Sequence, residues 1–179
     1  MGISYVKRCK KCKRKIYCSS GTGWVSGELL VDTIKQAKEG RKGKVLYEFF
    51  REHGNGIIDV EQVSFLCEDC GEISKGYDWT MYIPDKNASD GTDYDPLKDP
   101  KYFQESYLED YDGSRYMEYG CFDYSRFMED VKKSYRVYSK YPHTCKKCKG
   151  KKKIVDIESK MYCPECKVKL DDISSVFWD

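Results

Sequence analysis

The chain has 179 residues, of which 40% are hydrophobic and 35% are charged, and its formal net charge is +2. This length suits one domain or two small ones, and so few hydrophobic residues predict a core that needs extra cross-links. The sequence has no apolar leader and no apolar run of about 20 residues, so we do not expect a secreted or membrane-spanning protein. We expect a soluble, cytoplasmic protein, in which thiols stay reduced and paired cysteines more often bind metal than form disulfides.

Eight of the ten cysteines form four CxxC pairs: Cys9/Cys12, Cys67/Cys70, Cys145/Cys148 and Cys163/Cys166. Two residues between the thiolates let a tight turn, or knuckle, direct both sulfurs at one ion. Two knuckles complete the closed tetrahedral site of structural zinc. Four thiolates also suit iron, but zinc is the better default. The sequence therefore predicts two structural zinc ions.

The first knuckle lies in the basic stretch VKRCKKCKRK at 6–15, and we expect strands on either side of it over 3–17. Eight thiolates and two zinc ions would change the formal net charge from +2 to about −2. Lysines beside a knuckle would offset this local negative charge. The same lysines would also suit an anionic partner such as nucleic acid, so both interpretations stay open.

Two amphipathic helices are predicted between the first and second knuckles. Residues 28–39 place Leu30, Thr33, Ile34 and Ala37 on one face, with Ser26 at the start and Gly40 at the end; residues 44–53 place Leu46, Phe49 and Phe50 inward. Strands are expected near 57–66 and at 77–83. A long insertion between knuckles is tolerated, because the cost of loop closure grows slowly with length. We therefore predict one site from the first two knuckles, with pairing across the two halves as the alternative.

An acidic, tyrosine-rich segment follows. Residues 76–130 carry 14 acidic and five basic side chains, and ten of the 16 tyrosines lie between 85 and 141. The turn-rich sequence at 87–100 resembles a linker, and helices are expected over 100–111 and over 124–135, the second capped by Asp123. The tyrosines either pack this segment onto the rest of the chain or form a recognition surface. The candidates for partner binding are Tyr102, Tyr107, Tyr111, Tyr116 and Tyr119.

The third and fourth knuckles read CKKCKGKKKIVDIESKMYCPEC, with 14 residues between them, and a strand over 137–141 is expected to lead into them. The spacing, Lys149-Gly150 and Pro164 resemble a zinc ribbon over about residues 143–170. A CPxC ribbon followed by an apolar tail resembles small bacterial zinc-ribbon proteins of uncharacterised function. The aromatic tail is expected to be docked.

The predicted fold class is α+β, with two four-cysteine zinc ribbons of short antiparallel strands. The first ribbon, 1–84, contains the two-helix insertion, 85–141 is the acidic, partly helical insert, and 142–179 is the second ribbon with its tail. Cys18 and Cys121 are interpreted as small buried hydrophobes, with Cys18 as an alternative ligand.

A catalytic function is not expected. The sequence lacks HExxH, GxSxG, Walker and zinc-deaminase motifs, and four thiolates per ion leave no open coordination position. Its two histidines are His53, at the end of a predicted helix, and His143, two residues before a knuckle. Thiol redox chemistry of CxxC pairs is the weaker interpretation.

We therefore expect a zinc-stabilised binding protein without a small-molecule substrate. The leading hypothesis is that the acidic insert contacts a basic protein, in an inhibitor or immunity-type role. The alternative is nucleic-acid binding by the basic ribbons, with Tyr162 and Tyr141 stacking on bases. The candidate lysines for that role are Lys146, Lys147, Lys149, Lys151, Lys152 and Lys153. A third interpretation is a purely structural subunit of a larger assembly.

Overall fold

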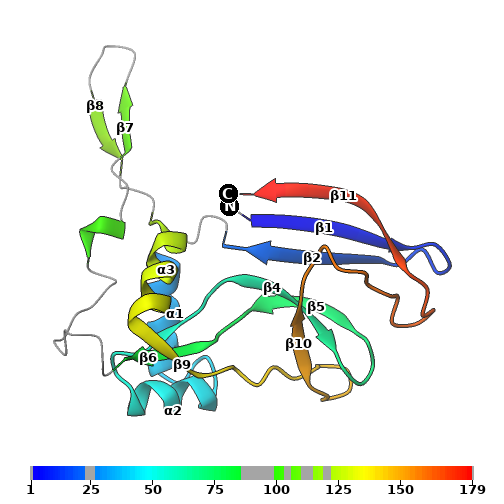
Figure 1. The fold of residues 1–179 in the computed structure, drawn as a ribbon, viewed down its shortest axis with the longest axis horizontal. Coiled ribbons are helices and arrows are strands. Elements are labelled where there is room, and N and C mark those ends of the chain that lie inside the picture. The colour runs from blue at the N-terminus through cyan, green and yellow to red at the C-terminus, as the bar shows by residue number, and fades with distance from the viewer. Residues whose placement is uncertain are drawn as a thin grey trace. The chain divides into compact units, whose positions relative to one another are not determined.

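A computed structural model describes residues 2–22, 27–85, 99–102, 106–109, 115–118 and 122–178. It is a mixed α/β protein with antiparallel sheets (Figure 1). The chain divides into two compact units, each assembled from separated segments and not from the consecutive ranges predicted from the sequence. The cysteine unit comprises Met1–Gly23, Val60–Trp79 and Lys140–Asp179, and the helical unit comprises Trp24–Asp59 and Thr80–Ser139.

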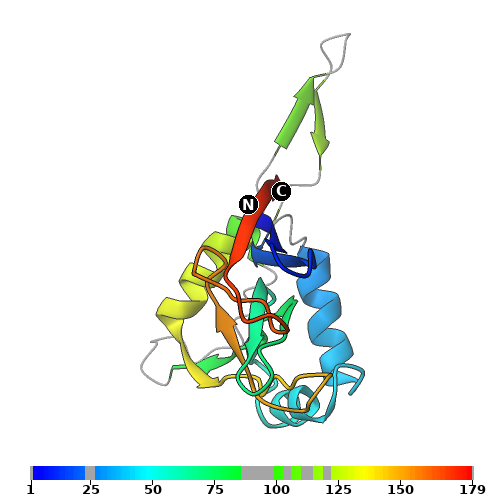
Figure 2. The ribbon, with the colours of Figure 1, turned by 90° about the vertical axis from the view of Figure 1, so that its right-hand side faces the viewer.

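The cysteine unit contains two groups of three antiparallel strands. The first group has the order β2-β1-β11 and the second has the order β5-β4-β10, and one pair, Gly21 with Gln62, joins β2 to β4. The strands are β1 (Gly2–Cys9), β2 (Lys15–Gly21), β11 (Leu170–Trp178), β4 (Gln62–Cys67), β5 (Ile73–Tyr77) and β10 (Lys152–Val155). Pairing of β1 with β11 brings the two chain ends together (Figures 1 and 2). The predicted hairpin over 3–17 and the predicted docking of the tail are confirmed.

The two groups repeat one pattern of strand pairing. In each, the residue before the first cysteine of one knuckle pairs with the third residue after that knuckle's second cysteine, as in Arg8 with Lys15 and Leu66 with Ile73. The first cysteine itself pairs with a strand that leaves a different knuckle, as in Cys9 with Leu170 and Cys67 with Lys152. The cysteine unit therefore contains the same arrangement twice, with the second copy nested inside the first along the chain.

The core of the cysteine unit contains residues from both groups of strands. Buried Cys9, Ile16 and Cys18 from the first group cluster with buried Ile73 from the second, and Leu66 and Val155 pack against them. Ile157 and Met161 complete this cluster from the segment between the third and fourth knuckles. Since side chains alternate along a strand, Phe65 and Ser74 project from the opposite face of the second group, where Phe65 is also buried.

The helical unit has its own sheet and core. Its three-stranded sheet has the order β3-β6-β9, formed by β3 (Ile57–Ile58), β6 (Met81–Pro84) and β9 (Tyr135–Ser139). The helices are α1 (Gly27–Lys38), α2 (Lys44–Glu52) and α3 (Tyr124–Ser134), which agree closely with the predictions. The predicted inward faces of α1 and α2 are buried, and the Asp123 carboxylate accepts a hydrogen bond from the Arg126 amide at the start of α3. The Ser26 cap lies outside the described residues.

Two elements differ from the predictions. The helix over 100–111 is wrong: Pro100–Tyr102 forms a single 3₁₀ turn, and β7 (Ser106–Glu109) pairs with β8 (Arg115–Glu118). Aromatic residues favour strands, and the helical signal of Pro100 extends no further than that turn. The predicted strand over 77–83 is interrupted, because Trp79 has a left-handed backbone, with φ of 56°, between β5 and β6. In the described part of the chain, no helix has both the length and the apolar character needed to cross a membrane.

Candidate metal centres

All four knuckles have the same backbone geometry. In each, the amide of the first cysteine donates to the carbonyl five residues later, and the amide four residues later donates back to the first cysteine's carbonyl, over 2.8–3.0 Å. The residue that closes this turn has φ between 57° and 74°; these residues are Lys13, Gly71, Lys149 and Lys167. The CxxC sequence therefore encodes the local turn, even though three of the four left-handed positions are lysines and not glycines.

The structure brings the knuckles together in two clusters, which correct the predicted pairing. The first cluster contains Cys9, Cys12, Cys163 and Cys166, and the second contains Cys67, Cys70, Cys145 and Cys148. The predicted pairing of the first knuckle with the second, and of the third with the fourth, is therefore wrong, and the alternative pairing across the halves is found. All eight predicted ligands belong to a cluster.

The strand pairing is the physical reason for this arrangement. Antiparallel pairing of β1 with β11 places Cys9 opposite Leu170, four residues after the fourth knuckle ends. Pairing of β4 with β10 likewise places Cys67 opposite Lys152, four residues after the third knuckle ends. These contacts join residues far apart in sequence, so the spacing between neighbouring knuckles does not reveal them.

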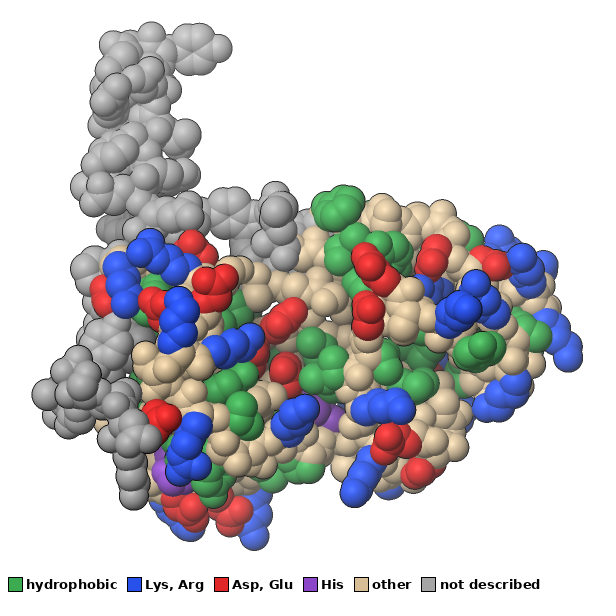
Figure 3. All heavy atoms as spheres, viewed as in Figure 1, with side chains coloured by type: hydrophobic (Ala, Val, Ile, Leu, Met, Phe, Trp, Pro, Cys, Tyr) green, Lys and Arg blue, Asp and Glu red, His purple; other side chains and the backbone are tan. Residues whose placement is uncertain are grey.

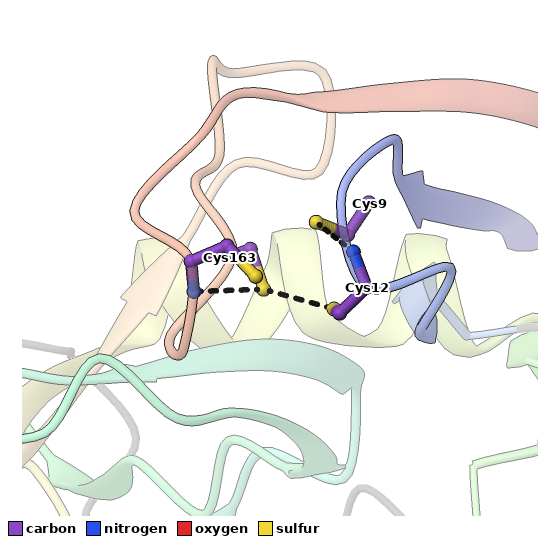
Figure 4. Close-up of side chains that lie close together, drawn as sticks. Cys9, Cys12 and Cys163 are labelled. Atoms are coloured by element: carbon purple, nitrogen blue, oxygen red, sulfur yellow. Dashed lines mark hydrogen bonds between the residues drawn. The ribbon is translucent and has the colours of Figure 1, made fainter.

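The sulfur positions fit a tetrahedral ion. Four thiolates bound to zinc at about 2.3 Å lie about 3.8 Å from one another. The Sγ atoms of Cys12 and Cys163 are 3.8 Å apart, and Figure 4 shows them facing each other between the two knuckles. In the second cluster, the Sγ atoms of Cys67 and Cys148 are 3.4 Å apart and those of Cys70 and Cys145 are 3.8 Å apart. The four sulfurs of each cluster lie within 4.8 Å of one another. Both clusters could therefore hold a metal ion.

The electrostatics of the clusters also favour a cation. The backbone amide of Cys12 donates to Cys9 Sγ and lowers the pKa of Cys9 to about 7, and the amide of Cys148 does the same for Cys145. Burial and the neighbouring cysteines raise the pKa of Cys166 to about 12. The thiols of Cys9 and Cys145 therefore lose their protons more readily than a free cysteine, while four thiolates cannot coexist at this spacing without a positive ion.

Several basic side chains beside the first cluster have acidic partners. Arg14 contacts the Glu165 carboxylate at 2.9 Å and the Glu72 carboxylate at 2.5 Å, and so links residues next to three knuckles. Lys10 lies 3.2 Å from Asp171, and the buried Lys7 ammonium lies 2.7 Å from the Asp172 carboxylate. These ion pairs neutralise part of the positive charge of VKRCKKCKRK with carboxylates, and the predicted compensation of the thiolates stays a prediction.

Other basic side chains have no ion pair among the described residues. Around the first knuckle these are Arg8, Lys11, Lys13 and Lys15, all exposed. Figure 3 shows lysine and arginine side chains gathering around the turn that joins β1 to β2. The surface therefore retains positive charge that local pairing does not neutralise.

The six candidate lysines for nucleic-acid binding differ in their surroundings. Lys147 and Lys153 lie 3.9 Å and 3.7 Å from glutamates, and Lys152 is half-buried with its ammonium 5.5 Å from the centre of the Phe65 ring. Lys146, Lys149 and Lys151 are exposed, and the described part of the chain offers them no ion pair. These three remain the candidates best placed for an external anion.

Close packing between chain segments explains two glycines beside the knuckles. A Cβ atom on Gly150 would lie 1.9 Å from the Asp69 carboxylate, so glycine lets the third knuckle approach the second. Gly71 has φ of 74° and lies against Pro164, which links the second knuckle to the fourth. Glycine is therefore needed at position 150 because no side chain would fit there, whereas the left-handed backbone position is Lys149.

Cys18 belongs to neither cluster. It is fully buried, its Sγ lies 3.7 Å from Met161 Sδ, and burial raises the pKa of its thiol. This confirms the interpretation of Cys18 as a small buried hydrophobe and leaves its alternative role as a ligand without support. Cys121 lies outside the described residues.

The five candidate tyrosines are only partly described. Tyr102 is 1% exposed, packs edge-on against Phe127 and donates a hydrogen bond to Asp130, so its assignment to a partner-binding surface is corrected. The backbones of Tyr107 and Tyr116 belong to the β7–β8 hairpin. Tyr111 and Tyr119 lie outside the described residues.

The histidines lie in different units and contact aromatic rings. His53 packs against Tyr138 in the helical unit, at 4.6 Å between ring centres. His143 packs against Phe65 at 4.2 Å and against Tyr141 at 4.8 Å. This second ring cluster, which also includes Tyr77 and Trp79, was not predicted from the sequence, because its members come from three separate stretches of the chain.

No family model, curated protein or solved structure matches this chain.

Proposed function

We propose that the two cysteine clusters hold two structural zinc ions and that each cluster, with its three strands, is a zinc ribbon. Four cysteines per ion fill the tetrahedral shell and leave no position for a substrate or a reactive water. The metal then stabilises a binding surface and takes no part in a reaction. The repeated strand pairing around the two clusters supports the same role for both ions.

We further propose that the cysteine unit binds nucleic acid. The observation that carries this proposal is its charge: the unit contains 18 basic and 11 acidic side chains, a formal excess of +7, which two zinc ions and eight thiolates reduce to +3. The helical unit has the opposite balance, with 14 basic and 19 acidic side chains. Basic groups without acidic partners attract phosphates, and counterion release makes such binding dependent on salt.

Replacing Lys146 and Lys151 with glutamine is expected to weaken nucleic-acid binding and its salt dependence. Each lost phosphate contact lowers the slope of log affinity against log salt by about 0.7 for a single strand, so the double variant should lose about 1.4. Fluorescence anisotropy with a labelled oligonucleotide over a salt series measures this slope.

The matched control makes the same charge change in the helical unit, at the exposed Lys35 and Lys132. The Lys35→Gln, Lys132→Gln variant should bind with the wild-type slope. Equal losses in both double variants would indicate a general effect of net charge, and no binding at low salt by the wild-type protein would reject the proposal.

Contact of the acidic segment with a basic protein is a second candidate function. The excess of nine acidic side chains over residues 76–130 supports it, because such a segment can steer a basic partner. Affinity capture with the full chain, in the presence of nuclease, tests it. A basic protein retained in stoichiometric amount would support this candidate, and loss of every partner on nuclease treatment would reject it.

A further inference from the structure

Four partly exposed aromatic rings form one cluster in the cysteine unit, which we call the Trp79 platform: Tyr77, Trp79, Tyr141 and His143. The Trp79 ring is nearly parallel to Tyr77 (19°, 6.5 Å between centres) and to His143 (26°, 6.2 Å). Tyr141 meets Trp79 edge-on, at 4.9 Å and 79°. Phe65, only 2% exposed, lies beneath His143. The platform thus consists of large rings with mutually fixed orientations.

The platform lies away from the core of the cysteine unit. Leu66 and Val155 face that core cluster, and Phe65, one position earlier on β4, projects from the opposite face of the strands. His143 reaches this face by packing on Phe65, and the chain between β5 and β6 supplies Trp79. None of the four platform rings belongs to the described core cluster around Cys9 and Ile73.

The ring of His143 is held in place by a hydrogen bond to the backbone. Its Nε2 atom lies 2.6 Å from the backbone carbonyl of Asp78, and only a protonated nitrogen can donate to a carbonyl oxygen. The ring also packs against Phe65 and Tyr141, at 4.2 Å and 4.8 Å between ring centres. His143 is therefore held in one orientation beside Trp79.

Two lysines near the platform can attract an anionic ligand, although the acidic Asp78, between Tyr77 and Trp79, also interacts electrostatically with His143. The Lys152 ammonium lies 5.5 Å from the centre of the Phe65 ring, and its backbone amide donates to the His143 carbonyl. Lys151, exposed and without an ion pair in the described part of the chain, is its neighbour. A cationic guest would be repelled by Lys152, whereas a phosphate beside a stacked ring would be attracted.

We propose that the Trp79 platform stacks an unpaired base of a single-stranded nucleic acid, while Lys151 and Lys152 contact the adjacent phosphates. This inference rests on the nucleic-acid-binding function proposed above and adds a preference for single strands to it. Aromatic rings bind bases through faces that are hidden in a duplex, and lysines alone do not distinguish the two forms.

Two platform variants test the proposal by anisotropy with a labelled single strand and with a duplex of the same sequence. Tyr141→Leu keeps the apolar bulk but removes the ring, and Trp79→Gly removes the ring at a left-handed position that glycine adopts easily. Each variant should bind the single strand about 5- to 100-fold more weakly, with duplex affinity within about twofold and the salt slope unchanged. Tyr17→Leu, at an exposed tyrosine on β2, is the matched control and should bind normally.

The outcomes distinguish a failure of the platform proposal from a failure of the proposed nucleic-acid binding. Wild-type binding with no effect of either platform variant would overturn the platform and leave the proposed function standing. Equal losses for single strand and duplex would also overturn it, because they indicate a general structural effect. No binding of any nucleic acid by the wild-type protein would reject the proposed function itself. If Trp79→Gly fails to fold, the Tyr141→Leu variant still tests whether the platform stacks a base.

Discussion

Replacing Cys163 with serine is expected to release one of two zinc ions and to unfold the strands around the first cluster. Cys163 is fully buried and its Sγ lies 3.8 Å from Cys12 Sγ. Structural zinc contributes about 10–16 kcal/mol of binding free energy, which is comparable to the whole stability of a typical domain. Elemental analysis should find one zinc per chain, and amide hydrogen exchange should show lost protection in β1 and β11.

The control for this variant is Cys18→Ser. Cys18 is equally buried but belongs to neither cysteine cluster. The variant should therefore keep both ions and lose only about 0.5–3 kcal/mol of unfolding free energy. Two zinc ions in the Cys163→Ser protein, with native protection of β1 and β11, would contradict the assignment of Cys163 as a ligand.

Replacing Phe127 with alanine is expected to reduce the unfolding free energy of the helical unit by about 3–5 kcal/mol. Phe127 is fully buried, and its ring contacts Tyr102 and Phe122 at 5.3 Å and Tyr124 at 6.2 Å. Removing the ring leaves a cavity among aromatic side chains that cannot collapse freely. Urea denaturation followed by the circular dichroism of the helices measures this loss.

The matched variant is Phe127→Leu, which keeps most of the volume and should cost clearly less than the alanine variant. Both variants should retain two zinc ions, because all eight cysteine ligands belong to the cysteine unit. A loss below about 1 kcal/mol in Phe127→Ala would show that this ring is not central to the core.

Local features of the fold were predictable from the sequence. The helices agree closely because their apolar residues repeat at helical spacing, as with Leu46, Phe49 and Phe50 in α2. The knuckles were predictable because two residues between cysteines suffice for the turn and its hydrogen bonds. Tyr102 was misassigned because the same tyrosine composition suits an interface and a core, and only its burial against Phe127 distinguishes them.

The partners of the knuckles were not predictable from their composition. Each cluster joins a basic CKKC knuckle to one that contains acid, CPEC in the first and CEDC in the second. The predicted consecutive pairing would also have joined a basic knuckle to an acidic one. Charge therefore does not distinguish the two arrangements, and strand register decides between them.

The Trp79 platform was missed for a similar reason. Trp79 was assigned to a continuous strand, and His143 was considered only as a neighbour of Cys145. The rings meet because β4 pairs with β5 and because His143, just before the third knuckle, packs on Phe65. Neither contact gives a periodic pattern in the sequence. A left-handed tryptophan is also unexpected from propensity.

Counting the zinc ions in two double variants by native mass spectrometry, after dialysis against a weak chelator, tests the nested pairing of the knuckles directly. Cys9→Ser with Cys163→Ser damages one cluster, so this protein should keep one zinc ion. Cys9→Ser with Cys67→Ser damages both clusters, so this protein should keep none. The reverse result, with one ion retained in the second protein and none in the first, would show that the knuckles pair consecutively along the chain and would contradict the structure.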